Sequence, residues 1–209
     1  MADPRVALDA FKEWGAVIKA LENGDQIGIL RRGHEDKPRF SYSRRRFWLI
    51  PTYDHQKEDY IQPLYRDYVS ESEQERDEAG DDHIRVSSWV QAKTMLKIEK
   101  NERLNWLTDY VVYSPRALQE RFQLQPNEAL YFLIVRVYNL PDPRILNQQP
   151  EYGTCSSGNP DDAWVELKQR IPMQADNPAI DLAEFEERKN KIRARLIRDE
   201  DEREEPMLF

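Results

Sequence analysis

The sequence predicts an α+β fold: a mixed sheet or partly closed barrel with flanking helices, a C-terminal helix and an acidic tail. Residues 129–140 (ALYFLIVRVYNL) form an almost continuous apolar run, which is typical of a central strand buried on both faces. Residues 182–198 carry opposite charges at helical spacing and follow Asp181, a favourable N-cap residue. Between the termini, candidate helices and strands alternate without an internal repeat, which favours a mixed sheet.

The first predicted helix covers residues 7–21. Its apolar side chains recur at the spacing of one helical stripe. They are Phe11, Trp14, Ile18 and Leu21. Gly24 then supplies the positive φ that ends a helix. The alternative is a hairpin, in which residues 16–21 form a strand that turns at Gly24.

The remaining elements follow from apolar runs and from proline positions. Strands are predicted at residues 26–31, 45–50, 89–98 and 110–113, and helices at residues 57–69 and 102–107. A further helix begins after Ser114, because a serine N-cap is followed by Pro115 at the first helical position. Pro51 is expected to end one strand, and Pro141 with Pro143 another. Residues 147–162 are predicted to be a loop.

Length and charge indicate one domain with acidic additions. The chain has 209 residues, of which 33% are charged and 39% hydrophobic. Residues 71–82 carry a net charge of −6 and residues 199–205 carry −5; because the whole chain is at −8, the rest is at +3. We therefore expect a single α+β domain over residues 1–198 with a mobile acidic insertion near 71–82, and an acidic tail over residues 199–209.

The composition also restricts the compartment. No apolar run is long enough to cross a bilayer, and the N-terminal residues lack the apolar stretch of a signal peptide. One cysteine, Cys155, excludes an internal disulfide and favours a reducing compartment. These observations predict a cytoplasmic protein without a membrane association.

The most unusual local chemistry lies in residues 31–56. This stretch holds seven basic residues, and aromatic side chains are interleaved with them. The basic residues are Arg31, Arg32, Lys37, Arg39, Arg44, Arg45 and Arg46, and the aromatic ones are Phe40, Tyr42, Phe47, Trp48 and Tyr53. Basic groups neutralise phosphate or carboxylate, and aromatic faces stack on bases. The stretch predicts an anion-facing surface, with nucleic acid as the expected ligand.

A polar cluster follows the strand predicted at residues 45–50. It consists of Thr52, Tyr53, Asp54, His55 and Gln56. Polar side chains at a strand end lie where many folds place their sites. His55 could act as a general base or contact a phosphate, with Asp54 or Gln56 orienting it. The alternative is a turn in which Asp54 caps the next helix.

Arg31, Arg32, Arg46 and Arg136 complete the predicted ligand-binding set. Arg136 interrupts the apolar run at residues 129–140, so burial is expected. Its guanidinium could clamp an anion. The alternative is an internal salt bridge, for which Glu13 and Glu166 are the candidate partners.

No metal or cofactor site is predicted. His34, His55, His83 and Cys155 are not at close ligand spacing, and no phosphate-cradling glycine loop is present. Asp82 followed by Gln91-x-Lys93 has the spacing of some metal-dependent nucleases, but a match this short is expected by chance.

Several segments together resemble an uncharacterised bacterial family, domain of unknown function 1802. They are EWGAVIKALENGDQIGILRRG, FWLIPTYDHQ, YSPRALQERF, LYFLIVRVYNLPDP, PEYGTC and WVEL, within residues 8–167. The resemblance implies no established activity; some members are associated with restriction-endonuclease-like domains, which implies a link to DNA defence. The chain departs from the family in having GTCSSGNPDDAWVEL where members have Gly-Cys-x-Ser-Trp, and Val111 and Tyr113 where members have His and Trp.

These observations favour a binding module for an anionic ligand, with nucleic acid as the first expectation. One alternative is a phosphodiesterase-type hydrolase that uses His55 and the arginines. The other is an adaptor that engages a protein partner through its acidic tail, which ends in Met207, Leu208 and Phe209.

Overall fold

The computed structural model describes residues 7–34, 45–98, 100–123, 128–153, 163–196 and 204–205. The strands are β1 (Asp9–Trp14), β2 (Gly28–His34), β3 (Arg46–Thr52), β4 (His83–Ile98), β5 (Glu128–Asn147), β6 (Trp164–Glu166) and β7 (Glu204–Glu205). The α-helices are α1 (Gly15–Glu22), α2 (Asp67–Ala79), α3 (Leu104–Leu107), α4 (Pro115–Phe122) and α5 (Leu182–Leu196). The 3-10 helices are η1 (Glu58–Tyr60), η2 (Pro63–Tyr65), η3 (Asn101–Arg103) and η4 (Pro150–Tyr152).

The strands form one mixed sheet in the order β2-β5-β4-β3-β1-β6, and the short β7 pairs with β4. The β1–β3 pairing is parallel, and the other pairings between described strands are antiparallel. The predicted α+β class with a mixed sheet and a C-terminal helix is confirmed, and the described sheet is open rather than closed into a barrel.

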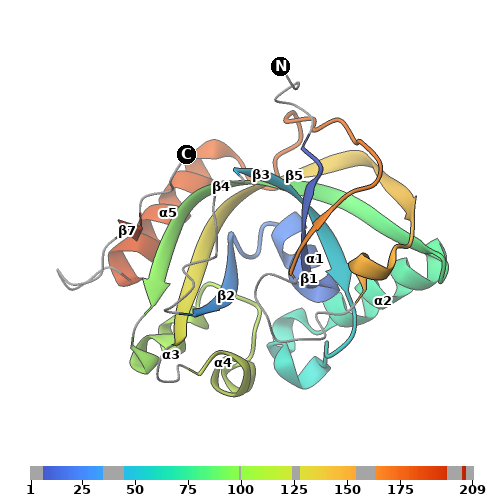
Figure 1. The fold of residues 1–209 in the computed structure, drawn as a ribbon. Helices are drawn as coiled ribbons and strands as arrows, with labels where there is room; N and C mark the ends of the chain where they lie inside the picture. Colours follow the sequence, from blue (N-terminus) through green and yellow to red (C-terminus); the bar gives the residue numbers. More distant parts are fainter. Residues whose placement is uncertain are drawn as a thin grey trace.

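The sheet is strongly curved, and its two faces bury different side chains (Figure 1). We call the face that α1 packs against the inner face; α5 lies outside the curve. Phe11, Phe47 and Val90 belong to the inner core together with residues of α1 and α4. Trp48 and Trp89, the neighbours of Phe47 and Val90 in sequence, belong to the second core on the outer face. This alternation follows from the two-residue period of a strand.

β5 confirms the central strand predicted at residues 129–140, because it lies between β2 and β4. The prediction that Pro141 and Pro143 end this strand was wrong. Asn139 pairs with Ser88, whereas Arg144 already pairs with Val86, so the prolines lie in a bulged segment. A bulge tolerates residues that cannot donate to the ladder, and the strand continues beyond them to Asn147.

The helix predicted over residues 7–21 is correct only in its second half. Residues 9–14 form β1, which lies between β3 and β6, and α1 begins at Gly15. The hairpin alternative is also wrong, because residues 16–21 are helical. Phe11 and Trp14 are buried, as they would also be in a helix. The spacing of these apolar residues therefore could not distinguish a strand from a helix. Gly24 ends α1 with a φ of +78°, as predicted.

The acidic segment predicted as a mobile insertion near 71–82 is helical over most of its length. α2 covers residues 67–79 and packs against α1 and β4. Ser72 is buried in this contact, and a Cβ on Gly15 would lie 2.7 Å from the Ser72 Cβ. The acidic residues of α2 lie mainly on its exposed side. A few small or apolar side chains on the other side pack against the domain.

Of the remaining predictions, the caps succeed and two elements fail, and Pro51 lies inside β3 rather than ending it. Ser114 caps α4 by accepting a hydrogen bond from the Ala117 N–H, and Asp181 accepts one from the Glu184 N–H at the start of α5. The helix predicted at residues 57–69 is instead η1 and η2 before α2, and residues 110–113 form a turn whose Tyr113 makes an isolated bridge to Ile61.

Candidate functional site

Two of the predicted arginines lie in one row across the outer face of the sheet. Arg46 of β3 is opposite Gln91 of β4, and Gln91 is opposite Arg136 of β5. Residues that are directly opposite in neighbouring strands project to the same face. The two arginines therefore lie on either side of Gln91, about 10 Å apart at two strand spacings.

A buried aromatic row supports this polar row. Trp48, Trp89 and Tyr138 occupy the next positions on the same face of the three strands. The Trp89 and Tyr138 rings stack with centroids 4.3 Å apart, and the Arg136 guanidinium lies 5.4 Å from the Tyr138 centroid. The buried rings fix the position from which Arg136 projects.

Lys93 adds a third cation to the outer face. It lies at a register shift between Ala92 and Thr94, where β4 bulges against β5. Burial lowers the pKa of Lys93, and repulsion from Arg136, Lys189 and Arg46 lowers it further, against the attraction of Glu186. Like charges are therefore gathered around Lys93. We call Arg46, Lys93 and Arg136 the basic cluster.

Arg136 differs from the expectation in its burial and in its lack of a carboxylate. It is partly exposed rather than buried. Among the residues that the structure describes, it forms no ion pair, and its buried Nε has no hydrogen-bond partner. Neither Glu13 nor Glu166, the two partners considered from the sequence, forms an ion pair with it. Arg136 instead lies on the same face as Arg46, and its charge repels that of Lys93.

Arg31, by contrast, is engaged in the inner core. It is 8% exposed, and its Nη2 lies 3.0 Å from Oε2 of Glu13 and donates a hydrogen bond to the Lys12 carbonyl. The other Glu13 oxygen accepts hydrogen bonds from the Trp14 N–H and from the Tyr113 hydroxyl. An internal salt bridge to Glu13 was considered for Arg136, but Arg31 makes it instead. Its position corrects the expectation that Arg31 lies on an anion-facing surface.

Arg32 does not meet Arg136 either. It is opposite Leu130 on β5, six residues before Arg136, which corresponds to about 20 Å along the strand. Its Nη2 donates a hydrogen bond to the Gln123 carbonyl. Lys37, Arg39 and Arg44 lie outside the described residues.

The polar cluster after β3 mainly supports structure. Thr52 donates a hydrogen bond to the Glu13 carbonyl, and Gln56 accepts one from the Ala16 N–H and donates one to Ser72. Gln56 thus satisfies an N–H of the first turn of α1 from a distant part of the chain. His55 is exposed in a turn with a φ of +69°.

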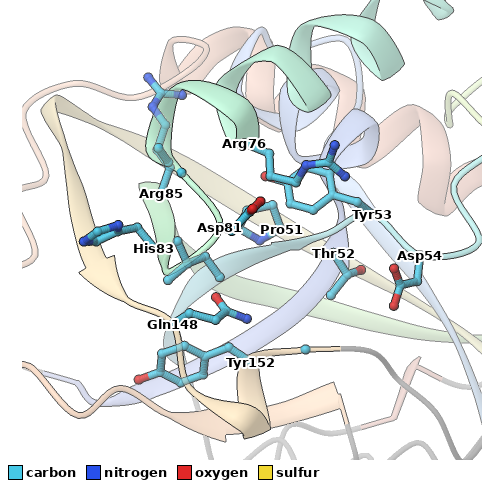
Figure 2. Close-up of a pocket in the computed structure, with 14 residues that line it drawn as sticks. Pro51, Thr52, Tyr53, Asp54, Arg76, Asp81, His83, Arg85, Gln148 and Tyr152 are labelled. Carbon is cyan, nitrogen blue, oxygen red and sulfur yellow. The ribbon is translucent and has the colours of Figure 1, made fainter.

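Tyr53 and its neighbours line a pocket of about 250 Å³ at the end of β3 (Figure 2). The labelled side chains around it come from β3, α2, β4, η4 and the loops next to them, and they are Pro51, Thr52, Tyr53, Asp54, Arg76, Asp81, His83, Arg85, Gln148 and Tyr152. The Arg76 guanidinium lies 5.3 Å from the Tyr53 ring centroid, and burial raises the pKa of Tyr53 to about 12. His55 and Gln56 do not line this pocket.

The pocket and the basic cluster are separate. Thr52 is six residues from Arg46 along β3, a distance of about 20 Å. The convergence of Arg32, His55 and Arg136 that a hydrolase would require is therefore not formed.

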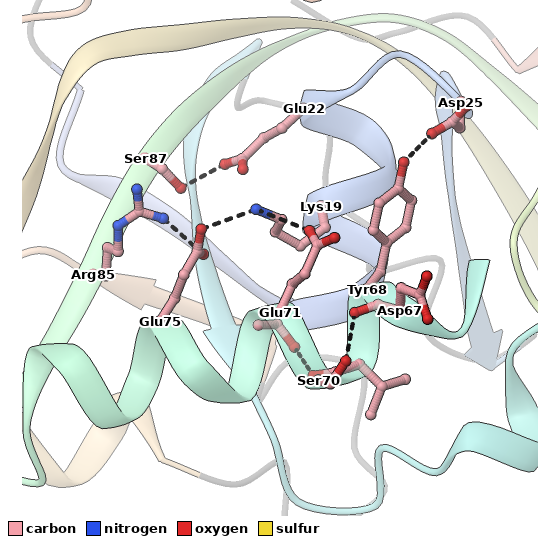
Figure 3. Close-up of polar contacts among 12 residues, drawn as sticks. Lys19, Glu22, Asp25, Asp67, Tyr68, Ser70, Glu71, Glu75, Arg85 and Ser87 are labelled. Carbon is pink, nitrogen blue, oxygen red and sulfur yellow. Dashed lines mark hydrogen bonds and ion pairs between the residues drawn. The ribbon is translucent and has the colours of Figure 1, made fainter.

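The α1–α2 interface holds a second group of charges, and here the signs alternate (Figure 3). Glu75 of α2 bridges Lys19 of α1 at 2.9 Å and Arg85 of β4 at 2.7 Å. Glu71 lies 3.5 Å from the same Lys19. Nearby, Ser87 donates a 2.5 Å hydrogen bond to Glu22, and burial raises the pKa of Glu22.

Metal-binding arrangements are absent from the part of the chain that the structure describes. No group of three or more His, Cys, Asp or Glu side chains there could hold a metal ion. Asp82 precedes the first residue of β4 and Lys93 lies eleven positions later, so the strand separates them by about 35 Å. At that distance Asp82 and Lys93 do not form the nuclease-like site considered from their spacing. Cys155 lies outside the described residues.

One comparison with known proteins identifies the family. The family model described as "Domain of unknown function (DUF1802)" matches residues 10–191. The chain belongs to this family. No curated protein and no solved structure matches it. The family match spans the basic cluster and the pocket, and it ends before β7. Among the described residues, no helix combines the length and apolar character needed to cross a membrane.

Sequence reasoning placed Arg46 and Arg136 in the anion-binding set, but it considered Gln91 and Lys93 only as part of a nuclease-like spacing. Only the strand register shows that Gln91 separates the two arginines and that a bulge brings Lys93 beside them. A signal was present in the sequence, because Arg46, Gln91 and Arg136 each lie two residues from an aromatic residue of the outer core. Assigning that signal requires knowing which strands are neighbours.

Proposed function

We propose that this protein binds an anionic ligand through the basic cluster, and that the ligand is nucleic acid. The observation that supports this most is the position of Arg136: it is partly exposed, stacked on Tyr138, and without an ion pair to any described residue. A cation held beside other cations raises the energy of the free protein, and an anion from outside would relieve that repulsion.

The geometry favours an extended polyanion over a small anion. Arg46 and Arg136 are separated by about two strand spacings, or 10 Å, so one small anion cannot contact both closely. A nucleic-acid strand presents a phosphate at every nucleotide and can contact several cations at once. Lys93 extends the same positive region toward α5, where Lys189 is paired with Glu186 at 2.5 Å.

The expected binding is driven by charge and tolerant of sequence. Of the aromatic side chains expected to stack on bases, Phe47 and Trp48 lie in the cores and are both 0% exposed, and Tyr53 lines the separate pocket. Phe40 and Tyr42 lie outside the described residues. Phosphate contacts position a protein on nucleic acid without reading its sequence.

A salt titration tests the proposal. The full chain is titrated with fluorescently labelled single-stranded DNA and RNA of mixed sequence at several salt concentrations. Affinity should fall linearly on a log–log plot, with a slope of about −0.7 for each phosphate contacted. Arg136→Gln should weaken binding several-fold and make the slope shallower.

Arg116→Gln is the matched control, because Arg116 is an exposed arginine on α4 and loses the same charge. It should bind as the unmodified chain does. Binding that is independent of salt, or no binding at low salt, would refute the proposal. Equal losses in the two variants would show that net charge, rather than the basic cluster, governs binding.

A further inference from the structure

The pocket at the end of β3 lies where β3 and β4 separate. Their pairing ends at Trp48 opposite Trp89. Beyond that point β3 continues along β1, and the first part of β4 runs along β5. Among the described residues, no ladder pair joins residues 49–52 of β3 to residues 83–88 of β4. The backbone groups on these two facing edges are therefore not used by the sheet.

Both unpaired edges contribute to the lining of this pocket. β3 supplies Pro51 and Thr52, and β4 supplies residues 83–85. A strand edge offers N–H donors and carbonyl acceptors, so it matches a ligand that carries both kinds of group. The volume of about 250 Å³ is just below the range of about 300–1,000 Å³ that is usual for drug-sized ligands. The pocket therefore suits one small ring system.

Arg76 presents a flat surface to the pocket. Its guanidinium lies over the Tyr53 ring, 5.3 Å from the centroid (Figure 2). It also donates hydrogen bonds to Asp77 from Nε at 3.1 Å and from Nη2 at 2.9 Å, which fix the plane of the group. The side chain is nevertheless 45% exposed, so its second face is accessible. Guanidinium planes stack on aromatic rings and on bases, and the pocket therefore favours a planar heterocycle.

Four polar side chains of the lining have hydrogen-bonding capacity that the described residues do not use. Asp54 and Asp81 make no ion pair with those residues, and the Tyr53 hydroxyl and the Gln148 amide make no hydrogen bond to them. Burial raises the pKa of Tyr53 to about 12, so the hydroxyl stays protonated and can donate. The two carboxylates only accept. The lining therefore favours a heterocycle that has N–H donors as well as acceptors.

We infer that this pocket binds a purine base and that the base is guanine. The purine stacks on the accessible face of Arg76, and its polar edge enters between β3 and β4. Guanine fits the carboxylates because its ring N–H and its amino group are adjacent donors, which one carboxylate can accept as a pair. Adenine, cytosine and uracil lack this pair of donors. The inference goes beyond the proposed function, because the pocket is about 20 Å from the basic cluster.

Calorimetric titration of the full chain with nucleosides tests the inference. A nucleoside carries no phosphate, so the basic cluster does not contribute and the proposed function is not at stake. Guanosine should bind, inosine, which lacks the amino group, should bind at least about tenfold more weakly, and ribose should not bind. Equal binding of guanosine and inosine, binding of ribose, or no binding of guanosine at millimolar concentration would overturn the inference.

Arg76→Ala removes the stacking surface. It should weaken guanosine binding roughly 5- to 150-fold, which is the range that one stacked base contributes. The matched control is Arg66→Ala, because Arg66 is an exposed arginine at the other end of α2 and does not line the pocket. The control and Arg136→Gln should both bind guanosine as the unmodified chain does. An equal loss in Arg76→Ala and Arg66→Ala would overturn the inference.

The preference for guanine is tested by Asp54→Asn with Asp81→Asn. This variant should lose most of the difference between guanosine and inosine, because an amide oxygen does not accept two donors as a carboxylate does. Asp142→Asn with Asp176→Asn is the matched control, since both aspartates are exposed and neither lines the pocket. It should keep the full difference. An unchanged preference in the pocket variant would overturn the inference.

Discussion

The inner and outer faces of the sheet hold partly buried charges in opposite ways. On the inner face, Arg31 faces Glu13, and Lys19 and Arg85 share Glu75. On the outer face, Lys93 and Arg136 lie beside each other without an ion pair to a described residue. A buried or half-buried charge is costly unless it is compensated. The inner charges are compensated within the domain, whereas no ion pair to a described residue compensates Lys93 or Arg136.

This difference separates structural arginines from candidate ligand-binding ones more reliably than their position in the sequence does. Arg31 lies in the most basic stretch of the chain but is fixed by Glu13, whose other oxygen accepts a hydrogen bond from Tyr113. Arg136 lies in the most apolar strand but is accessible. The contrast makes opposite predictions for the two residues.

The largest effect is expected when the inner ion pair is broken. Arg31→Met leaves the Glu13 carboxylate buried without its cation, which should lower the free energy of unfolding by roughly 3–5 kcal/mol. Urea denaturation followed by tryptophan fluorescence measures the loss. Adding Glu13→Gln should recover part of it, because the uncompensated charge is then removed. An unchanged unfolding midpoint for Arg31→Met would contradict the structural role of the pair.

A smaller loss is expected at the α1–α2 interface. Glu75→Gln removes the shared carboxylate from Lys19 and Arg85, whose side chains are 18% and 25% exposed. The free energy of unfolding should fall by about 1–2 kcal/mol, between the values of surface and buried pairs. Repeating the urea denaturation in high salt should reduce the difference between variant and parent. A loss that salt does not change would point to packing rather than charge.

The pH dependence of stability should show the effect of the raised pKa of Glu22. Burial raises the pKa of this carboxyl in the folded state above 4.5, so the folded protein binds its proton more readily than the unfolded chain does. Its contribution to stability is therefore present at low pH and is lost as pH rises through the raised pKa. Glu22→Gln should remove this loss and make stability depend less on pH above 4.5. Parallel pH profiles for the parent and the variant would contradict the assignment.

The smallest change in stability, and the one of opposite sign, is expected for Arg136→Met. Removing a cation from a repulsive group should leave the free energy of unfolding unchanged within about 0.5 kcal/mol or increase it. The same urea denaturation that shows a large loss for Arg31→Met would show this. A loss of several kcal/mol would mean that Arg136 has an internal partner after all, and the distinction between the two faces would fail.

The sequence predicted local features well and long-range ones poorly. The caps at Ser114 and Asp181 and the central strand β5 depend on neighbouring residues, and all three were found. β1 was mistaken for helix because its burial comes from β3 and β6, which join it from distant parts of the chain.

The candidate site follows the same rule. Arg46 and Arg136 were identified individually, but their alignment through Gln91 depends on the register of three strands. The acidic composition of residues 71–82 likewise gave no sign of helix α2, because its attachment depends on Ser72 meeting Gly15. Partners that lie 50 or more residues apart cannot be read from local patterns.

The pairing of β1 with β6 also has a kinetic consequence. It aligns Asp9 with Glu166, so the last edge of the sheet joins residues near the two ends of the domain. Contacts between residues so distant in sequence form slowly, because a long loop must close before the pairing is rewarded. During synthesis, β1 must therefore wait until β6 has left the ribosome, and until then its outer edge lacks the strand that pairs with it in the folded domain.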